Sequence, residues 1–378
     1  HLVEEVSVPA IIATLKPGDL RRGYEKYRAK HDIFYLSPVS VTSTVASEVD
    51  DDLVWSLLGQ PSDMAPTYAE LLQLAEKRLR RERHMQDDDA LKVALVTTKD
   101  AFDADLNDAV EPVLRFNGDK LALDNGVNYL PVKLDPDDPQ LEAQAQTIVD
   151  FGPDVIISAA SELFSMDGGL LPAIEVDWGG TQSKPPPFYV LSPYNAGNLN
   201  RVILLMNDAI EYTGETDPQL RFVGVSVAGP RDATLQNKYA LRLRAMFKKA
   251  YFDTANYYDA TYFMAYAMHA AGMDAELSGS RIAAGMHRLL DGKNFDVGPT
   301  NIDATFDALS RASSSIHLAS TLGPPDFDTK TGVRPVEGSV FCFDKVDVSV
   351  QLHTEALRYD RDSATLTGTF PCFDGFYP

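Results

Sequence analysis

Ser226 has the sequence surroundings of a catalytic nucleophile. The run Gly224-Val-Ser226-Val-Ala228 approximates the G-x-S-x-G elbow, in which a sharp turn between a strand and a helix exposes a hydrolase serine. Here Ser226 continues a strand-like apolar run, and Gly229-Pro230 separates it from the next helical segment. A serine hydrolase that uses Ser226 is therefore only a minor alternative.

The other residues that could carry chemistry form no metal or cofactor motif. The seven histidines are scattered without metal-ligand spacing, and the sequence has no phosphate-binding loop, dinucleotide fingerprint or EF-hand loop. Acidic clusters at 50–52, 87–89 and 135–138 lie in turn-like sequence, which favours solvated loops over calcium sites. We expect no metal, no cofactor and no enzymatic activity.

The two cysteines, Cys342 and Cys372, lie near the carboxyl terminus in strand-like sequence. Their spacing excludes a CxxC metal or redox pair. If the protein is exported, the two can form a disulfide; otherwise they are two separate buried thiols. Closing that loop would stabilise the fold by about 3–4 kcal/mol in the chain-entropy model.

Composition is that of a water-soluble protein with more than one domain. The chain has 378 residues, of which 44% are hydrophobic and 24% charged, and a single core rarely grows to that size. The net charge of −21 opposes binding to nucleic acid and to anionic membranes. No apolar run approaches the roughly 18–20 residues of a membrane span.

Five short apolar runs in the middle of the chain predict buried strands. They alternate with helical segments of about 12–15 residues, a pattern typical of a parallel, doubly wound sheet. The predicted strands are 92–98, 129–134, 154–158, 188–191 and 221–227, with helices from 101, at 140–151 and at 198–212. A similar unit comes earlier, with strands at 9–12 and 33–36 around a helix at 20–30.

Successive helices are predicted from 234 to 313. Asn256 with Asp259, and Thr300 with Asp303, have the spacing of helix capping boxes. In the tail, apolar and polar residues alternate from 346 to 352, which predicts a half-exposed antiparallel strand.

Several segments, in order, resemble the type I periplasmic solute-binding proteins of ABC transporters, particularly the leucine/isoleucine/valine-binding branch. The resemblance spans nearly the whole chain and rests on the ordered set of motifs. The matching segments are Val8-Pro-Ala-Ile-Ile12, Leu36-Ser-Pro-Val-Ser-Val-Thr42, Pro61-Ser-Asp-Met-Ala-Pro-Thr67, Lys92–Leu106, Tyr258-Asp-Ala260, Ala271-Gly272, Val297-Gly-Pro299 and Phe327-Asp-Thr-Lys-Thr-Gly332.

The resemblance implies an α/β protein of two lobes, each with a doubly wound parallel sheet, joined by a three-segment hinge. Lobe one would comprise 1–62 and 230–322, lobe two 63–229 and 334–378, and the third crossover 323–333. The family's opening strand, helix and second strand, at least roughly 30 residues, have no counterpart here. We therefore expect either a fragment with a processed or truncated start, or another segment in their place.

The family's amino-acid clamp is not preserved. Its carboxylate-holding serine falls on Pro17, which has neither a hydroxyl nor a backbone donor. Its ammonium-holding acid aligns with Val223, and its cleft tyrosine falls on Phe102. Burying a zwitterion without these partners would be costly, so the expected ligand is not a standard amino acid.

The resemblance implies that a monomer captures a small solute between its lobes and delivers it to an ABC transporter permease. It would act in the periplasm or elsewhere outside the cytoplasm, with a lipid anchor as one means of staying there. The alternative is a ligand-sensing receptor ectodomain or regulator on the same scaffold. The candidate ligand-binding residues are Ser40, Thr42, Phe102, Ser161, Glu162, Tyr194 and Tyr258.

Overall fold

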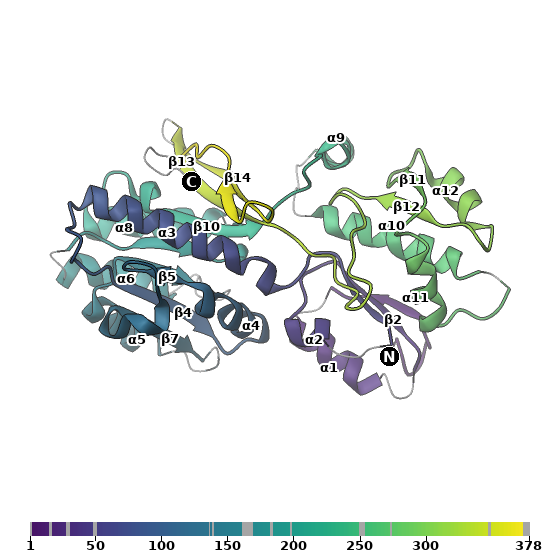
Figure 1. Cartoon of the computed structure of the whole chain (residues 1–378), viewed down its shortest axis with the longest axis horizontal. Helices are drawn as coiled ribbons and strands as arrows, with labels where there is room; N and C mark the ends of the chain where they lie inside the picture. Colours follow the sequence, from purple (N-terminus) through teal and green to yellow (C-terminus); the bar gives the residue numbers. More distant parts are fainter. Residues whose placement is uncertain are drawn as a thin grey trace. The chain divides into compact units, whose positions relative to one another are not determined.

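The computed structural model divides the chain into two compact units (Figure 1). Unit 1 comprises His1–Pro61 and Gly229–Val336, and unit 2 comprises Ser62–Ala228 and Glu337–Pro378. The structure describes residues 2–14, 17–27, 31–47, 51–135, 137, 140–160, 169–181, 184–196, 199–248, 254–272, 274–346 and 349–372. Within these residues, no helix is both long and apolar enough to cross a membrane.

Unit 2 is built on an eight-stranded sheet in the order β15-β14-β13-β10-β9-β8-β4-β7. Its central strands are parallel, and three antiparallel strands extend it on one side. The parallel strands are β4 (Val93–Thr98), β7 (Tyr129–Leu134), β8 (Val155–Ser158), β9 (Phe188–Leu191) and β10 (Phe222–Val227); the antiparallel ones are β13 (Gly338–Val346), β14 (Ser349–Asp360) and β15 (Thr365–Thr367).

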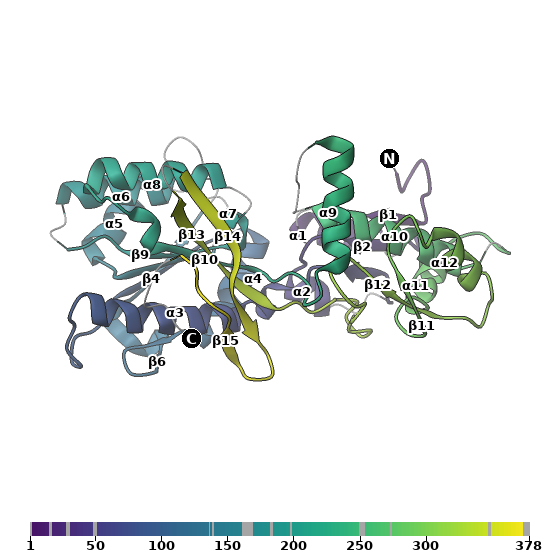
Figure 2. The same cartoon turned by 90° about the horizontal axis from the view of Figure 1, so that it is seen from above.

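Helices cover both faces of this sheet (Figure 2). Every residue of β4 is therefore buried, although successive side chains point to opposite faces. The five predicted central strands are confirmed to within one residue at each end. One face carries α3 (Ala65–Glu82) and α4 (Ala101–Val110), and the other carries α5 (Leu141–Phe151), α6 (Leu170–Thr181) and α8 (Leu199–Thr213).

The shorter elements of unit 2 connect these layers. They are the helix α7 (Pro193–Ala196), the small hairpin β5 (Arg115–Phe116) and β6 (Lys120–Leu121), and the 3-10 segments η1 (Pro61–Asp63), which starts in unit 1, η2 (Glu111–Val113), η3 (Ala122–Asn128) and η4 (Pro218–Arg221).

A disulfide joins the tail of unit 2 to its sheet. Cys342 lies in β13 and bonds to Cys372, 30 residues later. The single strand predicted from 346 to 352 is wrong, because β13 ends at Val346 and β14 begins at Ser349, with 347–348 outside the described residues. The alternation there belongs to two antiparallel neighbours whose Val346 and Ser349 are paired.

Unit 1 has a parallel sheet in the order β1-β2-β3, and a separate parallel pair, β11-β12. Val333 adds an isolated bridge to β3 at Ser56. The strands are β1 (Ala10–Ile12), β2 (Phe34–Ser37), β3 (Val54–Ser56), β11 (Lys293–Asp296) and β12 (Ile316–Ala319); the helices are α1 (Pro17–Tyr27), α2 (Ser43–Ser47), α9 (Thr234–Phe247), α10 (Ala255–Ala270), α11 (Gly279–His287) and α12 (Ile302–Leu309).

The two predicted capping boxes are wrong. Helix α10 begins one residue before Asn256, after Thr254, whose side chain does not cap the helix. Asn256 instead donates from Nδ2 to the carbonyl of Pro38, 2.7 Å away. Helix α12 likewise begins after Asn301 rather than after Thr300. In α10, the Asn256 side chain thus makes a tertiary hydrogen bond to Pro38 instead of the helix cap that the local spacing predicts.

Asp259, the other half of that expected box, holds a distant loop. Its carboxylate accepts hydrogen bonds from Thr321 N at 3.1 Å, Thr321 Oγ1 at 2.7 Å and Leu322 N at 3.1 Å. Burial raises the pKa of Asp259 to about 6, although these hydrogen bonds favour the charged form. Arg334, which is half-buried, adds an electrostatic attraction.

A buried ion pair links α6 to the sheet of unit 2. Arg221 Nη1 and Nη2 donate to the two carboxylate oxygens of Glu175 at 3.0 and 2.5 Å, and Tyr189 donates its hydroxyl to the same carboxylate at 2.5 Å. Arg221 also bonds Glu215 at 2.6 Å. Because Glu175 is fully buried, these partners replace the water that would otherwise surround its carboxylate.

Replacement of Arg221 by Met should destabilise unit 2 by about 3–5 kcal/mol, because it leaves the Glu175 carboxylate buried without its main partner. The double variant Glu175→Leu/Arg221→Met should recover most of that loss. The readout is chemical denaturation followed by the fluorescence of Trp178, in a Trp55→Phe background. Lys99→Met, which breaks an exposed pair with Asp135, should cost less than about 1 kcal/mol; equal costs for the two single variants would contradict the assignment.

Unit 1 should lose stability as the pH rises from about 4 to about 7. The pKa of Asp259 is about 6 in the folded protein, against an ordinary value of 3.8 that we take for the unfolded chain. The folded state therefore binds the proton more tightly, and below pH 4 this group stabilises the fold by about 2–3 kcal/mol relative to pH 7. In Asp259→Asn that pH dependence should disappear. Trp55 fluorescence in a Trp178→Phe background reports the unfolding of unit 1. Burial also raises the pKa of Glu70 and of Asp208, but both residues lie in unit 2. Parallel pH profiles for the two proteins would rule out this role.

Candidate ligand-binding site

The carboxyl ends of the parallel strands of unit 2 lie along one edge of its sheet, where α/β proteins commonly bind ligands. Strand β4 ends at Thr98, and Asp100 then caps α4 by accepting from Phe102 N at 3.0 Å. This cap fixes the start of α4 and so places Phe102 at the edge. Strand β9 ends at Leu191 and leads into α7, which carries Tyr194.

The structure brings Phe102 and Tyr194 together. Their ring centroids are 5.3 Å apart at an interplanar angle of 76°, an edge-to-face contact. Phe102 is buried, whereas Tyr194 keeps 38% of its surface exposed. The pair therefore forms an aromatic surface at the carboxyl edge, with Phe102 behind and Tyr194 open to solvent.

Asn195, which sequence reasoning missed, is a buried polar residue that follows Tyr194 in α7. Its Oδ1 accepts from Ser192 N at 3.0 Å, and the Ser192 hydroxyl lies 3.0 Å from both Asn195 Oδ1 and the carbonyl of Ala160. Its Nδ2 is buried and has no hydrogen-bond partner among the described residues. In the sequence, this residue could have been noticed as an amide side chain four positions after Leu191, the last residue of β9.

Two predicted residues come shortly after β8 in the sequence. Ser161 and Glu162 come directly after Ala160, and both lie outside the described residues. Their roles stay predictions.

In unit 1, Ser40 and Thr42 lie in the loop after β2. Ser40 donates its hydroxyl to the carbonyl of Leu58 at 2.8 Å, and the Thr42 hydroxyl accepts from Val45 N at 3.4 Å. Thr42 is buried and Ser40 is half-buried. Both side chains thus hold local backbone, and their binding roles stay predictions.

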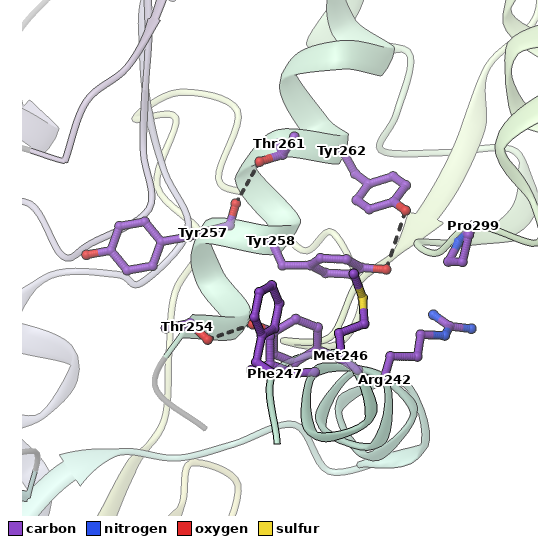
Figure 3. Close-up of a pocket in the computed structure, with 11 residues that line it drawn as sticks. Arg242, Met246, Phe247, Thr254, Tyr257, Tyr258, Thr261, Tyr262 and Pro299 are labelled. Atoms are coloured by element: carbon purple, nitrogen blue, oxygen red, sulfur yellow. Dashed lines mark hydrogen bonds between the residues drawn. The ribbon is translucent and has the colours of Figure 1, made fainter. Parts of the chain in front are cut away.

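Tyr258 faces a different part of unit 1. Its ring packs against Tyr239, with centroids 4.7 Å apart, and against Tyr262, with centroids 4.9 Å apart (Figure 3). Burial, together with the hydrogen bond to Tyr262, raises the pKa of the Tyr258 hydroxyl. It lines a pocket of about 630 Å³ whose walls include neither Ser40 nor Thr42.

Sequence reasoning aligned the family's ammonium-holding acid with Val223. Val223 is the second residue of β10, fully buried between Val190 and Cys342 in the middle of the sheet. The carboxyl end of this strand carries Ser226 and Val227 instead. Neither is acidic, so the described end of β10 offers no carboxylate to an ammonium group.

Ser226 does not occupy a nucleophile elbow. It pairs with Ser339 inside the β10–β13 ladder, and β10 continues to Val227 while α9 begins only at Thr234. An elbow requires an immediate strand-to-helix turn. Among the described residues, no group of three histidine, cysteine, aspartate or glutamate side chains could hold a metal ion.

No family model matches the sequence, and no curated protein matches it. Solved structures do match across nearly the whole chain. A leucine-binding protein from Thermotoga maritima is 13% identical, with a TM-score of 0.56, and the match covers 93% of this chain and 81% of that one.

Two further matches are solute-binding proteins of ABC transporters from Rhodopseudomonas palustris. One, in complex with p-hydroxybenzoic acid, is 12% identical with a TM-score of 0.59 and covers 98% of this chain and 81% of that one. The other, in complex with 3,4-dihydroxybenzoic acid, is 13% identical with a TM-score of 0.58 and covers 95% and 80%. The chain has the fold of the type I periplasmic binding proteins.

Proposed function

We propose that this protein is an extracytoplasmic solute-binding protein of an ABC importer, and that its ligand is an aromatic carboxylic acid rather than a standard amino acid. The observation that carries the proposal is the Phe102–Tyr194 surface at the carboxyl edge of unit 2; Asn195, the next residue along α7, has a buried Nδ2 without a hydrogen-bond partner among the described residues. A flat apolar ring can stack on such a surface, while an amide donor satisfies a carboxylate or hydroxyl oxygen.

The likeness to known structures supports the ligand class. Several neighbours of the same fold hold benzoate, 4-hydroxybenzoate or 3,4-dihydroxybenzoic acid. The same fold also serves a leucine-binding protein, so the scaffold alone does not choose the ligand. The choice rests on the residues at the edge, where an aromatic pair is present and the described end of β10 carries no acid.

The disulfide supports a place outside the cytoplasm. The Cys342–Cys372 bond ties β13 to the tail, and such bonds persist mainly in oxidising compartments. Binding and release require no covalent step, in keeping with the strand position of Ser226. Within unit 1, the binding roles of Ser40 and Thr42 remain predictions, whereas Tyr258 lines the separate pocket between α9 and α10.

Isothermal titration calorimetry with 4-hydroxybenzoate and with leucine tests the ligand class. We expect binding of 4-hydroxybenzoate and none of leucine. Tyr194→Ala should weaken the binding of 4-hydroxybenzoate by about tenfold or more, because the substitution removes an aromatic contact worth about 1 kcal/mol beyond its buried area. Tyr194→Phe should retain most of the affinity.

Tyr212→Ala is the matched control, because Tyr212 is an equally exposed tyrosine of unit 2 that lies at the far end of α8. Its affinity should equal that of the wild type. Tight binding of leucine, or identical titrations for Tyr194→Ala and Tyr212→Ala, would overturn the proposed ligand class.

A further inference from the structure

Unit 1 contains a pocket of about 630 Å³ between helices α9 and α10 (Figure 3). Most of its lining is aromatic or aliphatic. The lining comprises residues of α9 and α10 together with Thr254 and Pro299. A cavity of about 150 Å³ is enough to hold benzene, so this pocket has room for a ligand of two or more fused or linked rings.

Three tyrosines form its floor. The ring centroids of Tyr239, Tyr258 and Tyr262 follow one another at 4.7 and 4.9 Å. Their hydroxyls are held at the edges, because Tyr239 bonds Thr254 Oγ1 at 2.6 Å and Tyr258 bonds Tyr262 at 3.4 Å. A ligand can thus contact ring surface without disrupting a hydroxyl contact.

The outer wall is apolar and open to solvent. Met246 and Phe247 are 74% and 60% exposed, although both line the pocket. Helix α9 is attached only weakly, since among its described residues Tyr239 alone is buried. A ligand that contacts both α9 and α10 would bury this apolar surface and hold α9 in place.

Arg242 supplies one positive charge at the polar end of the pocket. Its guanidinium lies over Gly298, where a Cβ would come within 3.0 Å of Nη1, and it interacts with the Tyr258 hydroxyl. Figure 3 shows the guanidinium on the same side as Pro299 and the hydroxyls of Tyr258 and Tyr262. Among the described residues no carboxylate lies within ion-pair distance of it, in contrast to Arg221 or Arg358.

We propose that this pocket is a second small-molecule site, contained within unit 1, for an apolar anion with two or more rings. The rings would lie between α9 and the tyrosines, and the carboxylate or sulfonate would bond Arg242. A charged head and an apolar body match the two ends of the pocket. This site is independent of the proposed edge of unit 2 and takes a larger ligand.

Fluorescence titration with 8-anilinonaphthalene-1-sulfonate tests the site, because this probe combines linked aromatic rings with one negative charge. Arg242→Gln should lower the affinity for the probe by about tenfold, which is the effect of losing one charge-assisted hydrogen bond. The matched control is Arg244→Gln, which removes the same charge from an exposed position two residues along α9 and should leave affinity unchanged. N-phenyl-1-naphthylamine, the uncharged analogue, should bind wild type and Arg242→Gln equally.

Hydrogen exchange locates the bound probe. Saturating 8-anilinonaphthalene-1-sulfonate should slow amide exchange in α9 and in the first two turns of α10. Tyr194→Ala should not affect this probe, and Arg242→Gln should not affect 4-hydroxybenzoate, so failure of one proposal is distinguishable from failure of the other. Equal weakening by Arg242→Gln and Arg244→Gln, or unchanged exchange in α9, would overturn the second site.

Discussion

The five parallel strands of unit 2 end at one edge of the sheet, because parallel pairing aligns their carboxyl termini. The residues proposed to bind ligand in that unit lie within a few positions of those ends. Phe102 follows β4, while Tyr194 and Asn195 follow β9. The helices that cover both faces bury the strands, so ligand chemistry is left to the strand ends and the loops that follow.

Each unit contains a buried carboxylate, and the two are stabilised in different ways. Glu175 is paired with Arg221, and the pair joins α6 to the sheet at the start of β10. Asp259 makes no direct ion pair with another described residue but accepts hydrogen bonds from backbone and hydroxyl donors of the loop after β12. Its pKa is raised because hydrogen bonds offset only part of the cost of burial. Glu175 is matched by a guanidinium, whereas Asp259 takes up a proton in mild acid.

The two proposed sites use aromatic surface with different polar groups. At the edge of unit 2, a buried amide donor accompanies Phe102 and Tyr194. In unit 1, a guanidinium accompanies three tyrosines in a pocket of about 630 Å³. A neutral donor and a full charge select differently, since charge-assisted hydrogen bonds are stronger and favour anions. The net charge of the protein, −21, is common to both sites. The groups that line each site, rather than the net charge, therefore decide which ligand it can bind.

The sequence alone determined the parallel sheet of unit 2 and the identity of its aromatic residues. Runs such as 92–98 and 129–134 are short and continuously apolar, which is what a strand buried on both faces requires. The resemblance to a known family pointed to Phe102, and a place at the edge of an element pointed to Tyr194, so the two were separate candidates. Their distance in the chain gave no indication that the rings touch.

Tertiary structure alone decided which side chains meet. Local spacing assigned Asp259 to a helix cap, but packing turned it toward Thr321, 62 residues later. The depth of Val223 in the sheet, the partners of Tyr258 and the position of Arg242 over Gly298 likewise depend on contacts between distant segments. Periodicity reports which face of an element is apolar, whereas the partner of a polar side chain is set by whichever distant segment packs against it.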